Sequence, residues 1–101
     1  MKTSLQRRWT LFPVKDGIEI PYPVLEILDD LQLRDVITTY DIVDMYGGLN
    51  IEVWYANGYI KSTEPLRFRN IATVQRLNER HEAELRIMEL IKQLGLSRTP
   101  A

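Results

Sequence analysis

The sequence predicts a mainly α-helical fold, in which short helices of a helix-turn-helix-like kind precede one long C-terminal helix. Two observations lead to this prediction. Apolar residues recur every three or four positions in two segments, and the last third of the chain carries charges throughout. At 101 residues the chain forms one small domain. We expect an irregular N-terminal arm over residues 1–21, a helical region over residues 22–56 and a long helix over residues 64–96.

The N-terminal arm is expected to be irregular because Pro13, Gly17 and Pro21 interrupt it repeatedly. A first helix should follow over residues 23–32, since Pro23 is well suited to a first helical turn. The apolar residues of this segment form a single stripe at helical spacing, made of Val24, Ile27, Leu28 and Leu31.

A second helix is predicted from the capping signals around Thr38. Thr38 can cap a helix together with Asp41 three residues later, and Ile37 and Ile42 have the spacing of a hydrophobic staple. The glycine pair at residues 47–48 would end this helix.

Residues 49–55 are ambiguous, because their apolar positions fit a strand by alternation and a helix by period. As a helix they would complete a helix-turn-helix. A recognition helix here would offer no basic residue, and Glu52 would repel phosphates.

The long helix carries the charge asymmetry of the protein. Residues 65–101 hold seven basic and four acidic residues, a net of +3, and residues 1–64 hold six basic and ten acidic, a net of −4. The two add up to the total of −1. An acidic front joined to a basic helical back favours nucleic-acid or partner binding by the back end.

Arginines along one edge of this helix are the candidate DNA contacts. Arg69, Arg76 and Arg80 are seven and four residues apart, and Arg67 lies just ahead of them. Guanidinium groups in such a row could neutralise phosphates of double-stranded DNA. A solvated helix face without a ligand is the competing interpretation.

The end of the long helix is apolar on two sides, which predicts contact with a second subunit as well as with its own domain. The expected oligomer interface comprises Leu85, Ile87, Met88, Leu90, Ile91 and Leu94.

Catalytic and metal chemistry are not expected. His81 is the one histidine and the chain has no cysteine, so a zinc site lacks ligands. No phosphate-binding glycine loop or nucleophile–base pattern is found, and we expect neither enzymatic activity nor a cofactor. An apolar run of membrane length is also missing, which predicts a cytoplasmic protein without a membrane partner.

Two stretches resemble a compact helical family of phage terminase small subunits. The first stretch comprises Leu25–Leu31 (LEILDDL) and Ile37–Asp41 (ITTYD), similar to that family's helix, turn and Thr-x-x-Asp helix start. The second is Leu90–Pro100 (LIKQLGLSRTP), similar to its closing helix. Together they cover about a third of the chain, and the sequence departs at Ser97-Arg98, where Thr-Pro is usual.

The resemblance implies a non-enzymatic DNA-binding and assembly subunit of phage DNA packaging in a bacterial host cell. It would form a homo-oligomer, or a hetero-oligomer with a small terminase, and deliver DNA to a large terminase subunit. A small helix-turn-helix regulator of the MerR or excisionase kind, acting through residues 38–56, is the first alternative. A phage protein that binds only other proteins, without DNA contact, is the second.

Overall fold

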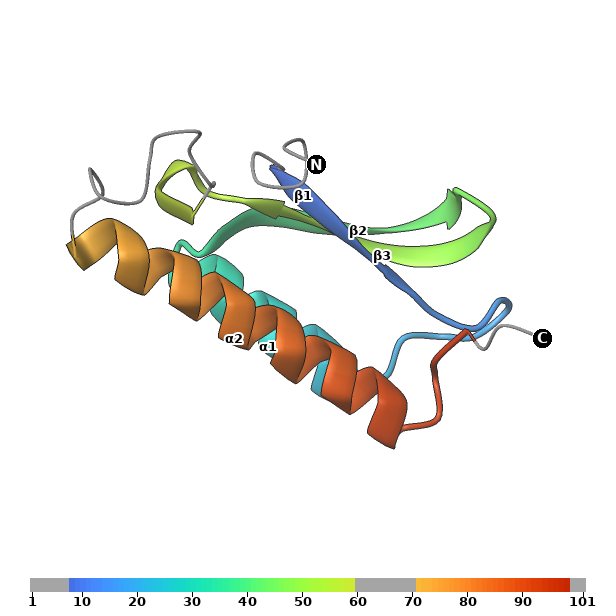
Figure 1. Ribbon diagram of the computed structural model, residues 1–101. Coiled ribbons are helices and arrows are strands. Elements are labelled where there is room, and N and C mark those ends of the chain that lie inside the picture. The colour runs from blue at the N-terminus through green and yellow to red at the C-terminus, as the bar shows by residue number, and fades with distance from the viewer. Residues whose placement is uncertain (1–7, 60–70, 99–101) are drawn as a thin grey trace.

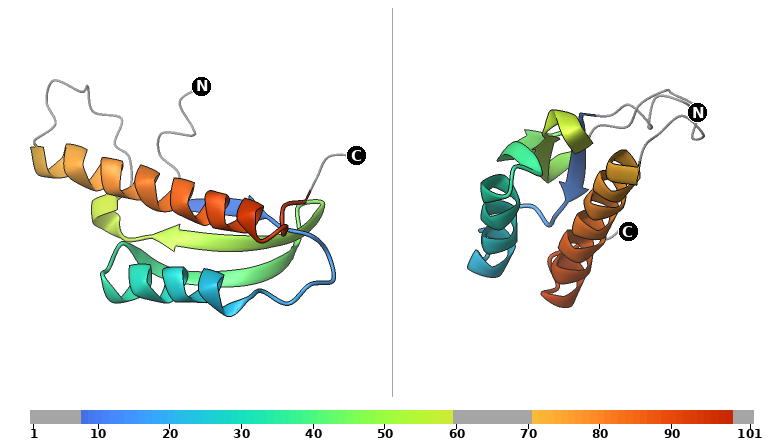
Figure 2. Two further views of the ribbon diagram at one scale, coloured as in Figure 1. Left: turned by 90° about the horizontal axis from the view of Figure 1, so that it is seen from below. Right: turned by 90° about the vertical axis from the view of Figure 1, so that its left-hand side faces the viewer.

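A computed structural model describes residues 8–59 and 71–98 and shows a mixed α/β fold. A three-stranded antiparallel sheet has the strand order β1-β3-β2, and both helices lie against one face of it (Figures 1 and 2). The elements follow in the order β1 (Trp9–Pro13), α1 (Tyr22–Leu33), β2 (Ile37–Met45), β3 (Gly48–Tyr55), a 3₁₀ turn (Asn57–Tyr59) and α2 (Ile71–Gln93).

The predicted mainly α-helical fold is therefore wrong, and the error is greatest over residues 38–55. These residues form the β2–β3 hairpin, in which Ile42 lies opposite Ile51. Thr38 caps no helix, and its hydroxyl instead donates to the Trp54 carbonyl. Alternating, largely β-branched residues favour the strand, and this preference outweighs the capping signals.

The hairpin turn explains why the glycine pair was misread as a helix end. Tyr46 and Gly47 both have positive φ, 58° and 89°, as a two-residue hairpin turn requires. No recognition helix exists over residues 49–55, because these residues belong to β3, so the helix-turn-helix interpretation is wrong.

The expected irregular arm also contains a strand. β1 pairs with β3 in a register that places Trp9 opposite Trp54 and Phe12 opposite Ile51. The two strands are far apart in the sequence, so no local pattern could reveal that they pair.

The first and the last of the three predicted helices are confirmed where the structure describes them. α1 has Pro23 in its first turn, and the predicted stripe of Val24, Ile27, Leu28 and Leu31 is buried. α2 ends at Gln93, and just beyond it the Leu96 and Gly95 amides donate to the carbonyls of Ile91 and Lys92, respectively. This pair of bonds is the Schellman arrangement. Residues 64–70 of the predicted long helix lie outside the described residues.

The hydrophobic core lies between the sheet and the two helices. Each fully buried large side chain contributes about 1.5–3 kcal/mol to folding. Neither helix within residues 8–59 and 71–98 is long and apolar enough to cross a membrane. The core residues are Phe12, Val14, Val24, Ile27, Leu28, Leu31, Val36, Ile37, Ile51, Val53, Tyr55, Ile87 and Ile91.

Candidate binding edge

β1 is a border strand whose outer edge points away from the sheet. The Val14 amide donates to the Leu49 carbonyl, and the Tyr55 amide donates to the Arg8 carbonyl. Because hydrogen bonding alternates along an antiparallel strand, even-numbered residues of β1 bond to β3 and the N–H and C=O of Leu11 point outward. Within the described residues, no strand pairs with this edge along β1.

The outer edge is bounded at its far end by the segment that follows α2. Val14 forms a bridge with Ser97, and the Lys15 amide donates to the Leu96 carbonyl. Pro13 has no N–H to donate. The segment that could accept an additional strand is therefore short and centred on Leu11.

A cavity of about 330 Å³ lies between this edge and α2. Its apolar wall includes Phe12 from β1 and Met88 and Ile91 from α2, and Leu11 borders it. Met88 and the neighbouring Leu85 are each 48% exposed. An apolar groove with exposed apolar side chains thus runs beside a strand edge that has outward-pointing hydrogen-bonding groups.

A polar network fixes β1 against α2. One oxygen of Glu84, Oε2, accepts a hydrogen bond from the Thr10 hydroxyl at 2.8 Å and another from the Tyr55 hydroxyl. Arg80 Nε lies 3.4 Å from the same oxygen. Burial, together with the bond to Glu84, raises the pKa of Tyr55 well above its ordinary value. The Glu84 carboxylate is therefore occupied by neighbouring side chains and acts as a tether between the two elements.

Arg80 belongs to this internal network, contrary to its predicted place in an exposed row of DNA contacts. It is 6% exposed, its guanidinium carbon lies 3.9 Å from the centre of the Tyr55 ring, and NH1 donates to the Tyr59 carbonyl at 3.0 Å. A buried cation requires such partners. The spacing of Arg80 and Glu84, one helical turn, is the sequence signal that could have indicated this pairing.

The other predicted DNA contacts divide into two groups. Arg76 is exposed, and its side chain passes close to Gly58, where an added Cβ would lie 3.1 Å from the Arg76 Cδ. Arg67 and Arg69 lie outside the described residues.

The predicted oligomer interface is also divided by the structure. Ile87 and Ile91 are 1% and 4% exposed and belong to the protein's own core, so they cannot form an external surface. Leu90 is half-buried and packs against the core. Leu85, Met88 and Leu94 remain exposed. The two-sided apolar character of α2 thus arises partly from packing within one chain.

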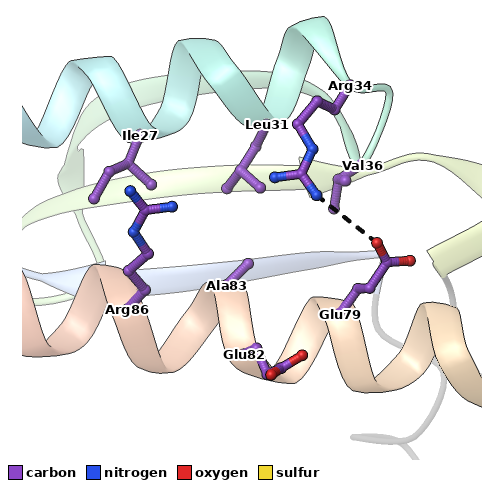
Figure 3. Close-up of a pocket in the computed structure, with 8 residues that line it drawn as sticks. All are labelled: Ile27, Leu31, Arg34, Val36, Glu79, Glu82, Ala83 and Arg86. Atoms are coloured by element: carbon purple, nitrogen blue, oxygen red, sulfur yellow. Dashed lines mark ion pairs between the residues drawn. The ribbon is translucent and has the colours of Figure 1, made fainter.

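The opposite side of α2 forms a second cavity, of about 280 Å³, with α1 (Figure 3). Ile27 and Leu31 of α1 and Ala83 of α2 line its apolar part, as Figure 3 shows. Arg34 bridges the two helices by approaching Glu79 at 3.8 Å. This ion pair is solvent-exposed, so it contributes about 0–1 kcal/mol. The cavity lies between two helices, whose backbone groups are bonded within each helix, so it lacks the strand edge that β1 offers.

Comparison with known proteins gave no match to a family model, a curated protein or a solved structure. Among the side chains of the described residues, no group of three or more histidine, cysteine, aspartate or glutamate residues is arranged to hold a metal ion.

Proposed function

We propose that the protein is a non-enzymatic assembly subunit that pairs with a second copy of itself along β1 and α2. The observation that carries the proposal is that the β1 edge is uncharged and has outward-pointing backbone hydrogen-bonding groups. β1 (WTLFP) contains no charged residue, whereas natural edge strands are commonly protected by charges or bulges. The exposed Leu85 and Met88 lie on the helix beside it.

A two-fold axis at Leu11 would pair two β1 strands in antiparallel orientation. The outward N–H and C=O of Leu11 would then bond to those of Leu11 in the second copy. The same operation would bring the two α2 helices together and cover Leu85 and Met88 of each copy. Such an interface is closed and self-complementary, which limits the assembly through this edge to a dimer.

The strength of this association is expected to be modest. Covering a half-exposed leucine or methionine contributes about 1 kcal/mol, and each new backbone hydrogen bond contributes about as much. Part of this gain is offset by the cost of bringing two molecules together. We therefore expect a dimer whose population depends on concentration in the micromolar range.

Sedimentation velocity across micromolar concentrations tests the proposal. The unmodified protein should form a dimer, and Leu85→Lys should shift the equilibrium towards monomer. Leu33→Lys is the matched control, because Leu33 is 83% exposed at the end of α1 and is not part of the proposed interface. A monomer at all concentrations, or an equal effect of the two substitutions, would contradict the proposal.

Double-stranded DNA is the second candidate partner, and it would place the assembly in DNA packaging as the terminase resemblance implies. The net charge of +3 in residues 65–101 and the exposed Arg76 favour it. A mobility shift with duplex DNA at low salt, weakening as salt rises, would support this role. If no shift occurs at low salt, a purely protein-binding role is favoured.

A further inference from the structure

The sheet has a second face, opposite the helices, that neither α1 nor α2 covers (Figure 2). Side chains alternate between the two faces along each strand. The register places Leu11 opposite Glu52 and Trp9 opposite Trp54, and Asp41 of β2 lies on the other side of Glu52. Since Phe12, Ile51 and Val53 point into the core, these five side chains share the outer face.

Three aromatic rings form a row on this outer face. The Trp9 ring stacks on Tyr46, with centroids 6.1 Å apart, and lies equally close to Trp54. Tyr46 is 60% exposed and occupies a hairpin-turn position with φ of 58°, where glycine or asparagine is usual. A bulky aromatic residue is costly in this conformation. The contact with Trp9 accounts for the position of the Tyr46 ring, but it leaves most of the Tyr46 side chain exposed.

Two carboxylates lie beside the aromatic row. Asp41 and Glu52 are directly opposite each other on neighbouring strands, an arrangement in which like charges repel. Neither forms an ion pair with another of the described residues. Arg98, a nearby cation, donates to Asn50 Oδ1 at 2.9 Å. The outer face therefore combines exposed aromatic surface with two carboxylates that form no ion pair with a described cation.

We propose that this face binds an arginine-bearing peptide segment of a partner protein. A guanidinium is flat, so it can stack on an aromatic ring while donating paired hydrogen bonds to a carboxylate. Its charge would also relieve the repulsion between Asp41 and Glu52. A nucleic acid could stack on the rings, but its phosphates would add negative charge. A neutral sugar would leave the repulsion in place.

Intrinsic fluorescence provides a direct measurement, because Trp9 and Trp54 are the chain's two tryptophans and both lie on this face. The probe is a short capped peptide with two arginines, and its control is the same peptide with citrulline, the uncharged analogue. The arginine peptide should change the tryptophan emission in a saturable way, and the citrulline peptide should not. An equal response to both peptides would overturn the proposal.

Glu52→Gln tests whether the carboxylate contributes. It should weaken binding of the arginine peptide about tenfold, since a hydrogen bond between charged groups becomes one to a neutral group. Glu26→Gln, on the exposed side of α1, is the control with the same change in charge and should bind normally. Glu52→Gln should also melt no lower than the unmodified protein, because it removes a like-charge contact. Unchanged affinity of a folded Glu52→Gln variant would contradict the proposal.

Two further measurements separate this site from other ligands and from the proposed dimer. An oligothymidylate or a neutral oligosaccharide should leave the emission unchanged, and saturation by either would overturn the choice of an arginine peptide. The Leu85→Lys variant should retain the response, because Leu85 belongs to α2 on the other side of the sheet. Peptide binding and dimer formation can therefore fail independently of each other.

Discussion

The two border strands of the sheet differ in how they meet the helices. Ile51 of β3 lies between Phe12 of β1 and Ile42 of β2 in the same cross-strand row. Phe12 is 2% exposed, whereas Ile42 is 36% exposed. α2 lies under β1, where Glu84 bonds to Thr10, while the β2–β3 hairpin extends beyond the helices (Figure 1).

The outer edges of the two border strands also differ, because the edge of the loosely covered β2 is protected against pairing with another strand. β2 carries two exposed aspartates, Asp41 and Asp44, and has an irregularity in its register between Ile37 and Thr39. Charges and bulges of this kind discourage pairing with another strand. β1 has neither, although it is the strand that is better anchored to the core. A firmly held strand whose edge carries neither a charge nor a bulge is suited to association, and a loosely covered strand whose edge carries both is not.

The largest effect is expected from removing the anchor of β1. Phe12→Ala should lower the free energy of unfolding by about 3–5 kcal/mol, because it leaves a cavity under the strand. Ile42→Ala, in the same row, should cost about 1 kcal/mol or less, since its side chain is already partly in solvent. Urea denaturation measures both. Equal losses would show that the two border strands are anchored alike.

A smaller effect is expected from the tether between β1 and α2. Glu84→Gln should cost about 2 kcal/mol, because the buried Arg80 guanidinium then faces a neutral group. Glu82→Gln is the matched control on the exposed side of the same helix and should change stability by about 0.5 kcal/mol or less. Thermal melting of the two variants makes the comparison. If the two variants have the same melting temperature, Glu84 does not hold β1 to α2.

The smallest effect concerns the contact of β2 with α1 and depends on pH. The Tyr40 hydroxyl donates to Asp29 Oδ1 at 2.5 Å, and this bond, with burial, raises the pKa of Tyr40 from 10.0 to about 12. The unfolded chain therefore loses the Tyr40 proton at lower pH than the folded chain. The stabilisation is complete below pH 10 and is lost as the pH rises towards 12.

Tyr40→Phe should cost about 1 kcal/mol at pH 8, the value of one hydrogen bond. The stability difference between this variant and the unmodified protein should shrink at alkaline pH, because the unmodified protein alone loses the bond. The urea midpoints of the two proteins, measured at pH 8 and again at alkaline pH, give this stability difference. The raised pKa of Tyr55 affects both proteins equally and cancels in the comparison. A difference that stays constant up to pH 12 would contradict the role of Tyr40.

Part of the candidate binding edge could be identified from the sequence, and part could not. The apolar excess on α2 placed Leu85 and Met88 in a predicted oligomer interface, and both are exposed in the single chain. The same pattern could not separate them from Ile87 and Ile91. The helical period of apolar residues shows that two sides are apolar, but it does not show which side packs on the sheet. Arg80 was misplaced for a related reason. Its network depends on Tyr55, which lies on a strand that the sequence did not establish.

The sequence by itself determined the two helices. Helical hydrogen bonds connect residues four apart, so the stripe of α1 and the glycine that ends α2 are visible in a short window. The pairing of β1 with β3 is different, because these two strands lie far apart in the chain and the β1 segment alone is equally compatible with a loop. Thr10 and Glu84 are 74 residues apart. Only the tertiary structure, by laying α2 under β1 and leaving the hairpin to extend past α1, decided that β1 joins β3 in the sheet and which sheet edge remains available to a partner.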